Sequence, residues 1–274
     1  AVSRCVYADY EKLYRFANDE SREFLNFITL DEELQAVLKA LRRLASPPAE
    51  EEGTDVLPPL FRNLPGHCLE KLRRAASWEE LCAAVRGTIF EKPLLSLERD
   101  EKTGLPALSQ AVTALEASYF SSLADYMQTG YSGPDARELT NAVVFRADML
   151  NIAYLMRLRR FGAAAESRGR LLLPLHGSVT AKIERQVLEA GSDEEALALL
   201  RGTKSGRYLP KDFDGSAEAL ARAAQSAYFR RVLHGRPGLQ VVYAFLTLRE
   251  FEADMLRRVF VALKYGLSPA PYMA

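Results

Sequence analysis

Residues 31–44 read DEELQAVLKALRRL, and the same pattern returns without a gap at residues 148–161, DMLNIAYLMRLRRF. In both stretches the apolar residues fall three and four positions apart, the spacing that places them on one face of a helix. Both stretches also carry a basic pair just before their last residue, Arg42-Arg43 and Arg159-Arg160, which suits the negative C-terminal end of a helix dipole. The repeated pattern therefore predicts two amphipathic helices of the same design.

Helical periodicity continues through most of the chain. Residues 134–161 and 237–265 each predict a long helix, the second opened by Pro237 and closed by Gly266. Strand-like alternation is not convincing anywhere. Proline and glycine predict loops at three places, residues 46–66, 91–106 and 203–217. The expected class is all-α, built from long amphipathic helices.

The repetition extends beyond the first helix. Leu64-Pro-Gly-His67 resembles Leu173-Pro-Leu-His176, and residues 77–88 align without a gap on residues 192–203. The second alignment starts with a Ser followed three residues later by Glu, which predicts a capping box. In a partial third copy Glu252 stands where Asp148 stands. We therefore expect three helical repeats packed side by side, at residues 1–95, 107–212 and 216–274, the third incomplete.

Composition restricts the function. Lys plus Arg and Asp plus Glu both number 36, so a globally basic nucleic-acid-binding protein is excluded. Three cysteines are too few for a disulfide framework and indicate reduced thiols. The apolar runs are far shorter than the roughly 18 residues that cross a bilayer.

The recurring acids Asp31, Asp148 and Glu252 allow two interpretations. They line a shared cavity, or they pair with nearby cations or face solvent, and we favour the second. The arginine pairs at the helix ends either complement the helix dipole or contact an acidic partner, and the dipole role is the simpler one.

The sequence offers little for catalysis. His67 and His176 follow proline-containing loops, and neither has the spacing of a metal site. Arg86-Gly-Thr88 and Arg201-Gly-Thr203 lack the phosphate-loop pattern and follow helices instead of preceding them. We therefore predict no catalytic residue, cofactor or metal. An all-helical hydrolase or transferase using His67, His176 or Glu252 is the enzyme alternative, and it requires these groups to converge in one pocket.

Two segments resemble a known family, the C subunits of bacterial and archaeal V/A-type ATPases, whose eukaryotic counterparts are the d subunits of V-ATPases. Asp148-x-x-Asn151 running to Leu158-Arg159 and then Leu173-Pro174 resembles the middle repeat of that family. Residues 238–267, with Arg249-Glu250-Phe-Glu252, Leu256-Arg257 and Lys264-Tyr-Gly-Leu267, resemble its closing helix more closely. The likeness runs from about residue 20 to the end.

The resemblance implies a pseudo-threefold, funnel-shaped, all-helical body without a catalytic site. Such a protein sits on the cytoplasmic face of the membrane proteolipid ring and holds the central stalk, so that both turn together. Family members carry a longer N-terminal segment, which would complete the third repeat. The candidate structural or partner-contact residues are Asp31, Asp148, Asn151, Arg159, Arg160, Glu250, Glu252 and Arg257. A free-standing helical-repeat scaffold remains the alternative from another class.

Overall fold

The computed structural model describes residues 2–46, 68–130, 134–160, 172–173, 175, 177–211 and 215–269. Across these ranges every regular element is a helix, and the only extended pairing is an isolated bridge between Arg99 and Pro106. The predicted all-α class is confirmed. The elements are α1 (Val2–Phe16), α2 (Asp19–Ala45), α4 (Leu69–Arg74), α5 (Trp78–Ala84), α6 (Glu91–Leu95), α7 (Leu108–Gly130), α8 (Pro134–Arg160), α10 (Ala181–Glu189), α11 (Asp193–Arg201), the 3₁₀ turn η1 (Gly206–Tyr208), α12 (Ala217–Leu233) and α13 (Leu239–Lys264).

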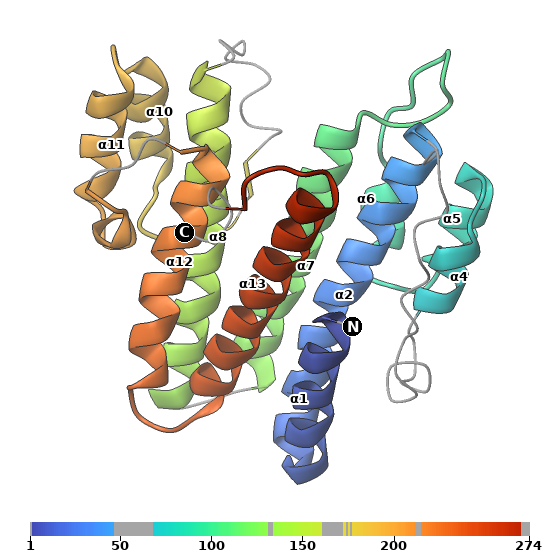
Figure 1. Ribbon diagram of the computed structural model, residues 1–274, viewed down its shortest axis with the longest axis horizontal. Coiled ribbons are helices and arrows are strands. Elements are labelled where there is room, and N and C mark those ends of the chain that lie inside the picture. Colours follow the sequence, from blue (N-terminus) through green and yellow to red (C-terminus); the bar gives the residue numbers. More distant parts are fainter. Residues whose placement is uncertain are drawn as a thin grey trace.

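The long helices stand side by side, and the short ones gather at the two ends of the molecule (Figure 1). Helix α8 packs on α7, α12 and α13, while α2 packs on α7 and α1 packs on α13. Helices α4, α5 and α6 lie at one end of the long axis, and α10 and α11 lie at the other (Figure 1). This arrangement places the middles of α2, α8 and α13 in the interior.

Local sequence signals set several helix ends. The Asn18 side chain accepts a hydrogen bond from the N–H of Ser21 and so caps α2. Helix α13 begins at Leu239, two residues after the expected Pro237, and ends at Lys264, just before the expected closing glycine, Gly266. Gly266 has φ +67°, and the N–H groups of Gly266 and Leu267 donate to the carbonyls of Leu263 and Ala262. These two bonds form a Schellman motif, which favours glycine at this position.

Both predicted capping boxes are present. The Ser77 hydroxyl accepts from the N–H of Glu80, whose carboxylate accepts from the N–H of Ala76 at 2.8 Å. Ser192 and Glu195 make the same pair of bonds, with Gly191 as the backbone donor. Helices α5 and α11 therefore begin where the sequence indicated.

The core consists of two buried clusters that share α8. The first joins the stripe of α2, including Leu34 and Leu38, to α7 and α13. The second joins the C-terminal half of α8 to α10, α11 and α12. The Tyr119-Phe120 and Tyr228-Phe229 pairs pack in or against these clusters.

Two expected loops contain helix. Residues 91–106 were expected to lack regular structure, yet Glu91–Leu95 forms α6 with the buried Leu94 facing α7. Pro93 is tolerated because it occupies the first turn, where its missing N–H would have had no partner within the helix. Residues 203–217 likewise contain η1. Apart from Ser46, the expected loop at residues 46–66 lies outside the described residues.

Candidate functional site

An arginine of α8 forms the centre of a buried polar group. Arg146 Nη2 donates to Asp31 Oδ2 of α2 at 3.0 Å and lies 3.9 Å from Glu250 Oε2 of α13. Its Nη1 lies 3.4 Å from the hydroxyl oxygen of Tyr243, also of α13. The Arg146 and Asp31 side chains are only 14% and 9% exposed. One guanidinium thus ties together three long helices, and we call this group the Arg146 centre.

The surroundings of the centre raise the pKa values of Arg146 and Glu250. Burial opposes the charged guanidinium, but Asp31, Tyr243, Tyr119 and Glu250 together outweigh it and hold the pKa of Arg146 well above its usual value, with Asp31 contributing most among them. Burial, followed by repulsion from Asp31, raises the pKa of Glu250 well above its usual range. Asp31 is therefore the primary counter-ion of Arg146. Asp31 and Glu250, both candidates from the sequence, make their contacts within this chain.

Asp148 has a different role from its sequence counterpart Asp31. Its carboxylate is fully buried and accepts from the N–H groups of Gly177 and Ser178 at 2.9 and 2.8 Å. The hydroxyls of Ser178 and Ser205 also donate to it, at 3.1 and 2.6 Å. Four hydrogen bonds compensate the buried charge and hold the segment before α10 against α8.

Asn151, one turn further along α8, holds the same segment. The N–H of Leu173 donates to Asn151 Oδ1 at 2.7 Å, and Asn151 Nδ2 donates back to the Leu173 carbonyl at 3.2 Å. Both Asn151 and Leu173 are fully buried. The paired bonds satisfy backbone groups that would otherwise be buried without partners. Asp148 and Asn151 act together as an anchor for Leu173, Gly177 and Ser178.

On α2 the side chain that binds the backbone of the following loop is not the one that the sequence alignment indicated. Glu33 Oε1 accepts from the N–H of Cys68 at 3.1 Å. Cys68 aligns with Gly177, so Glu33 takes the role of Asp148 although it lies two positions beyond the aligned Asp31. The signal in the sequence is that Glu33 is a carboxylate within the apolar stripe of α2, where Thr29 and Asp31 are also buried.

The arginines at the end of α8 reach the start of α11. Arg159 Nε and Arg160 Nε donate to the two oxygens of Asp193 at 2.9 and 3.2 Å. Partial burial opposes ionisation of Asp193, but the two guanidinium groups outweigh it and lower the Asp193 pKa. Arg159 also donates to the Ala190 carbonyl. These residues therefore fasten the α10–α11 pair to α8.

The remaining candidates lie on α13, which carries an exposed apolar surface. Glu252 pairs with Arg249, which also donates to Asp9 of α1 at 2.9 Å, and Arg257 is exposed. Beyond Arg257, the end of the helix and the turn after it carry large apolar side chains that are between 54% and 68% exposed. We call them the α13 apolar patch: Phe260, Val261, Leu263, Tyr265 and Leu267. Exposed apolar side chains gathered at one end of a helix are a candidate contact surface.

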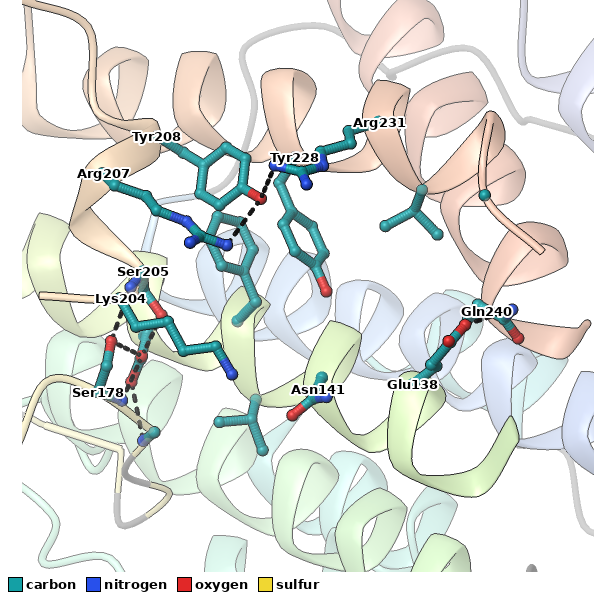
Figure 2. A pocket seen from close by; sticks show the side chains of 16 residues that line it. Glu138, Asn141, Ser178, Lys204, Ser205, Arg207, Tyr208, Tyr228, Arg231 and Gln240 are labelled. Atoms are coloured by element: carbon teal, nitrogen blue, oxygen red, sulfur yellow. Dashed lines mark hydrogen bonds between the residues drawn. The ribbon is translucent and has the colours of Figure 1, made fainter. Parts of the chain in front are cut away.

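A cleft opens between α8, η1 and α12 (Figure 2). The buried Asp148 is among the residues that line it. The cleft has a volume of about 530 Å³ and is lined by both charged and aromatic side chains. We call it the α8–α12 cleft, and its lining includes Asn141, Lys204, Arg207, Tyr228 and Arg231. His67 and His176, the histidines of the enzyme alternative, lie outside the described residues. Within the described ranges, no three His, Cys, Asp or Glu side chains are placed to hold a metal ion.

Comparison with known protein families shows which family the chain belongs to. Residues 1–271 match the family described as the ATP synthase (C/AC39) subunit. The chain belongs to the C/AC39 family. The resemblance expected from the sequence is thereby confirmed, and the chain is a member of the V/A-type ATPase class of subunits. No curated protein matches the chain. None of the helices in the described part of this C/AC39 chain has the length and apolarity required to cross a bilayer.

Proposed function

We propose that the protein is the non-catalytic rotor subunit of a V/A-type ATPase, which sits on the membrane proteolipid ring and holds the central stalk. Membership of the C/AC39 family over residues 1–271 is the observation that carries this proposal. In this role the protein couples ATP hydrolysis elsewhere in the complex to ion transport, at the cytoplasmic face of the membrane. The three-repeat, funnel-shaped arrangement stays a prediction within the proposal.

The internal construction supports a mechanical role. A protein that transmits torque must deform little, and helices packed at native density are stiff. Here the Arg146 centre ties α2, α8 and α13 together in the interior. The anchor at Asp148 and Asn151 and the arginines on Asp193 fasten the short helices to α8. Polar side chains thus cross-link the elements that would have to move together.

The α13 apolar patch supports docking, and we assign it to the central stalk. Phe260 lies on α13 near its C-terminal end, and Tyr265 and Leu267 lie beyond that end. The patch therefore covers one end of a long helix. Two exposed cations of the same helix border it, Lys264 and Arg258, and Arg258 also pairs with Asp254 at 3.0 Å. The matching partner surface is an apolar helix face with carboxylates at its edge. A soluble stalk protein with this surface would bind here and bury the patch.

Binding to purified central-stalk subunits of the same organism tests the proposal. Calorimetry or co-elution should give a one-to-one complex of the unaltered chain with the stalk. Replacing Phe260 and Leu263 together by Ser should weaken this complex by about tenfold or more, because apolar anchors dominate such interfaces. Leu95→Ser is the control, since Leu95 is 58% exposed, like Phe260, but lies on a different helix, α6.

The outcomes separate the candidate functions. Loss of affinity in the Phe260/Leu263 variant but not in Leu95→Ser supports docking of the stalk at the patch. Equal affinity in all three proteins would remove the patch from the proposal while leaving stalk binding intact. If neither the stalk nor a reconstituted proteolipid ring bound the unaltered chain, the free-standing scaffold would become the better description.

A further inference from the structure

Three cationic side chains from separate parts of the chain line the α8–α12 cleft. Lys204 follows α11, Arg207 lies on η1, and Arg231 lies in the last turn of α12. All three side chains are exposed, and all three line the same hollow (Figure 2). Three positive charges around one cavity form a strong local field in a chain whose total charge is zero.

These cations have no acidic partners within the described ranges. Two arginines on the helices that border the cleft do have acidic partners, Arg157 of α8 with Glu218 and Arg222 of α12 with Asp254. By contrast, Arg207 Nη2 and Arg231 Nη1 both lie near the neutral hydroxyl oxygen of Tyr208, at 3.3 and 3.5 Å. Two guanidinium groups that converge on a neutral oxygen repel each other, and an anion bound between them would relieve the repulsion.

Two carboxylates also line the cleft, but both already have hydrogen-bond donors. Asp148 is fully buried and accepts four hydrogen bonds from the segment before α10 and from Ser205. Glu138 Oε2 accepts from Gln240 Nε2 at 2.9 Å, on the side of the cleft away from Arg207 (Figure 2). Neither carboxylate makes an ion pair with Lys204, Arg207 or Arg231 among the contacts of the described residues.

Neutral donors complete the lining. The hydroxyl of Tyr228 points into the hollow, and the Asn141 amide stands opposite the Lys204 ammonium (Figure 2). Burial raises the pKa of Tyr228 to about 12, so its hydroxyl keeps its proton at neutral pH and is available to donate. A volume of about 530 Å³ is ordinary for a small-molecule site.

We propose that the α8–α12 cleft binds a phosphate-bearing small molecule, with Lys204, Arg207 and Arg231 as its charged ligands. A terminal phosphate carries close to two negative charges at neutral pH and several acceptor oxygens. It can accept from both arginines, the lysine and the neutral donors at once, whereas a single carboxylate has only two oxygens. This inference is independent of the rotor role, because the cleft lies away from the α13 apolar patch.

Titration of inorganic pyrophosphate into the purified chain tests the proposal, with calorimetry at low salt as the measurement. One saturable site is expected, and added salt should weaken it. Replacing Arg207 and Arg231 together by Gln should weaken binding by about tenfold or more, because two charge-assisted hydrogen bonds are lost. Lys204→Gln alone should also weaken pyrophosphate binding, in the chain with both arginines intact.

Arg230→Gln is the matched control, since Arg230 is exposed on α12 next to Arg231 but does not line the cleft. Circular dichroism establishes that each variant is folded. Loss of binding in the cleft variants with retention in Arg230→Gln supports the site. Absence of saturable binding, or an equal loss in Arg230→Gln, overturns it. Binding of a glutamate-rich peptide in place of pyrophosphate would also overturn it and reassign the cleft to a partner protein's carboxylates.

Discussion

Arg146 and Asp31 are 115 positions apart in the chain, yet their side chains meet at 3.0 Å in the interior. The pair joins α8 to α2. Glu250 and Tyr243 of α13 contact the same guanidinium group of Arg146. A charge this deeply buried is stable only while its partner is present. The Arg146 centre is therefore a point at which one substitution affects the packing of three helices.

Replacing Arg146 by Met should lower the free energy of unfolding by about 3 to 5 kcal/mol, because Asp31 is left buried without its counter-ion. Urea denaturation followed by circular dichroism measures the change. Arg157→Met is the control on the same helix, because Arg157 and Glu218 are 46% and 42% exposed and such pairs contribute about 1 kcal/mol or less. Adding Asp31→Asn to Arg146→Met should recover part of the loss. Equal, small losses in both single variants would show that the centre is not structurally important.

Replacing Asn151 by Ala should cost about 2 to 3 kcal/mol, since two buried backbone groups of Leu173 lose their partners. The same urea experiment measures it. Asn141→Ala on the same helix is the matched control, because Asn141 is exposed and a surface change of this kind stays within about 0.5 kcal/mol. Proteolysis should also be faster near residue 173 in the Asn151 variant. A stability equal to that of Asn141→Ala would contradict the anchoring role.

Glu116 makes stability depend on pH. Burial raises its pKa from 4.5 to about 7, although the Tyr154 hydroxyl donates to its carboxylate. Folding therefore favours protonated Glu116, and its stabilising contribution is complete below pH 4.5 and lost as the pH rises through 7. A shift of this size corresponds to about 3 kcal/mol.

The comparison of the unaltered chain with Glu116→Gln isolates this group, because burial also raises the pKa values of Glu32 and Glu250. The uncharged glutamine should become more stable relative to the unaltered chain on going from pH 5 to pH 8. Urea midpoints at the two pH values provide the measurement. A stability difference that is the same at both would show that Glu116 titrates normally.

Gly177 has no room for a side chain. A Cβ atom there would lie 2.7 Å from Asp148 Oδ2 and 2.5 Å from Val144 Cγ1. Gly177→Ala should therefore cost about 1 to 3 kcal/mol through overpacking and a displaced Asp148. In Gly191→Ala the nearest atom is the flexible carboxylate end of Glu195 at 3.3 Å, and we expect a change below about 1 kcal/mol. Thermal unfolding of the two variants in parallel distinguishes these effects.

Features that depend on neighbouring residues could be predicted from the sequence. The apolar spacing within residues 31–44 and 148–161 indicated the helices because one face of each had to be buried. The capping boxes at Ser77 and Ser192 and the end of α13 at Gly266 followed from side chains within a few positions of the backbone groups they satisfy. The resemblance of residues 238–267 to a closing helix also depended only on the order of residues along the chain.

The roles of the aligned acids could not be predicted in the same way. Asp31 and Asp148 occupy equivalent places in the alignment, yet one pairs with Arg146 and the other binds backbone N–H groups. Near α2 the N–H of Cys68 is reached by Glu33 instead. Which carboxylate reaches a loop depends on the side-chain length and on where the loop crosses the helix, and neither is encoded in periodicity.

The sequence by itself determined the helical class, the positions of the long amphipathic helices and the likeness to the C/AC39 family, because each of these depends on local spacing and residue order. Only the tertiary structure decided that Arg146 is the partner of Asp31, that the α13 apolar patch remains uncovered, and that Lys204, Arg207 and Arg231 surround one cleft. Those relationships join residues that are distant in the chain, and the packing of α2, α8, α12 and α13 brings them together.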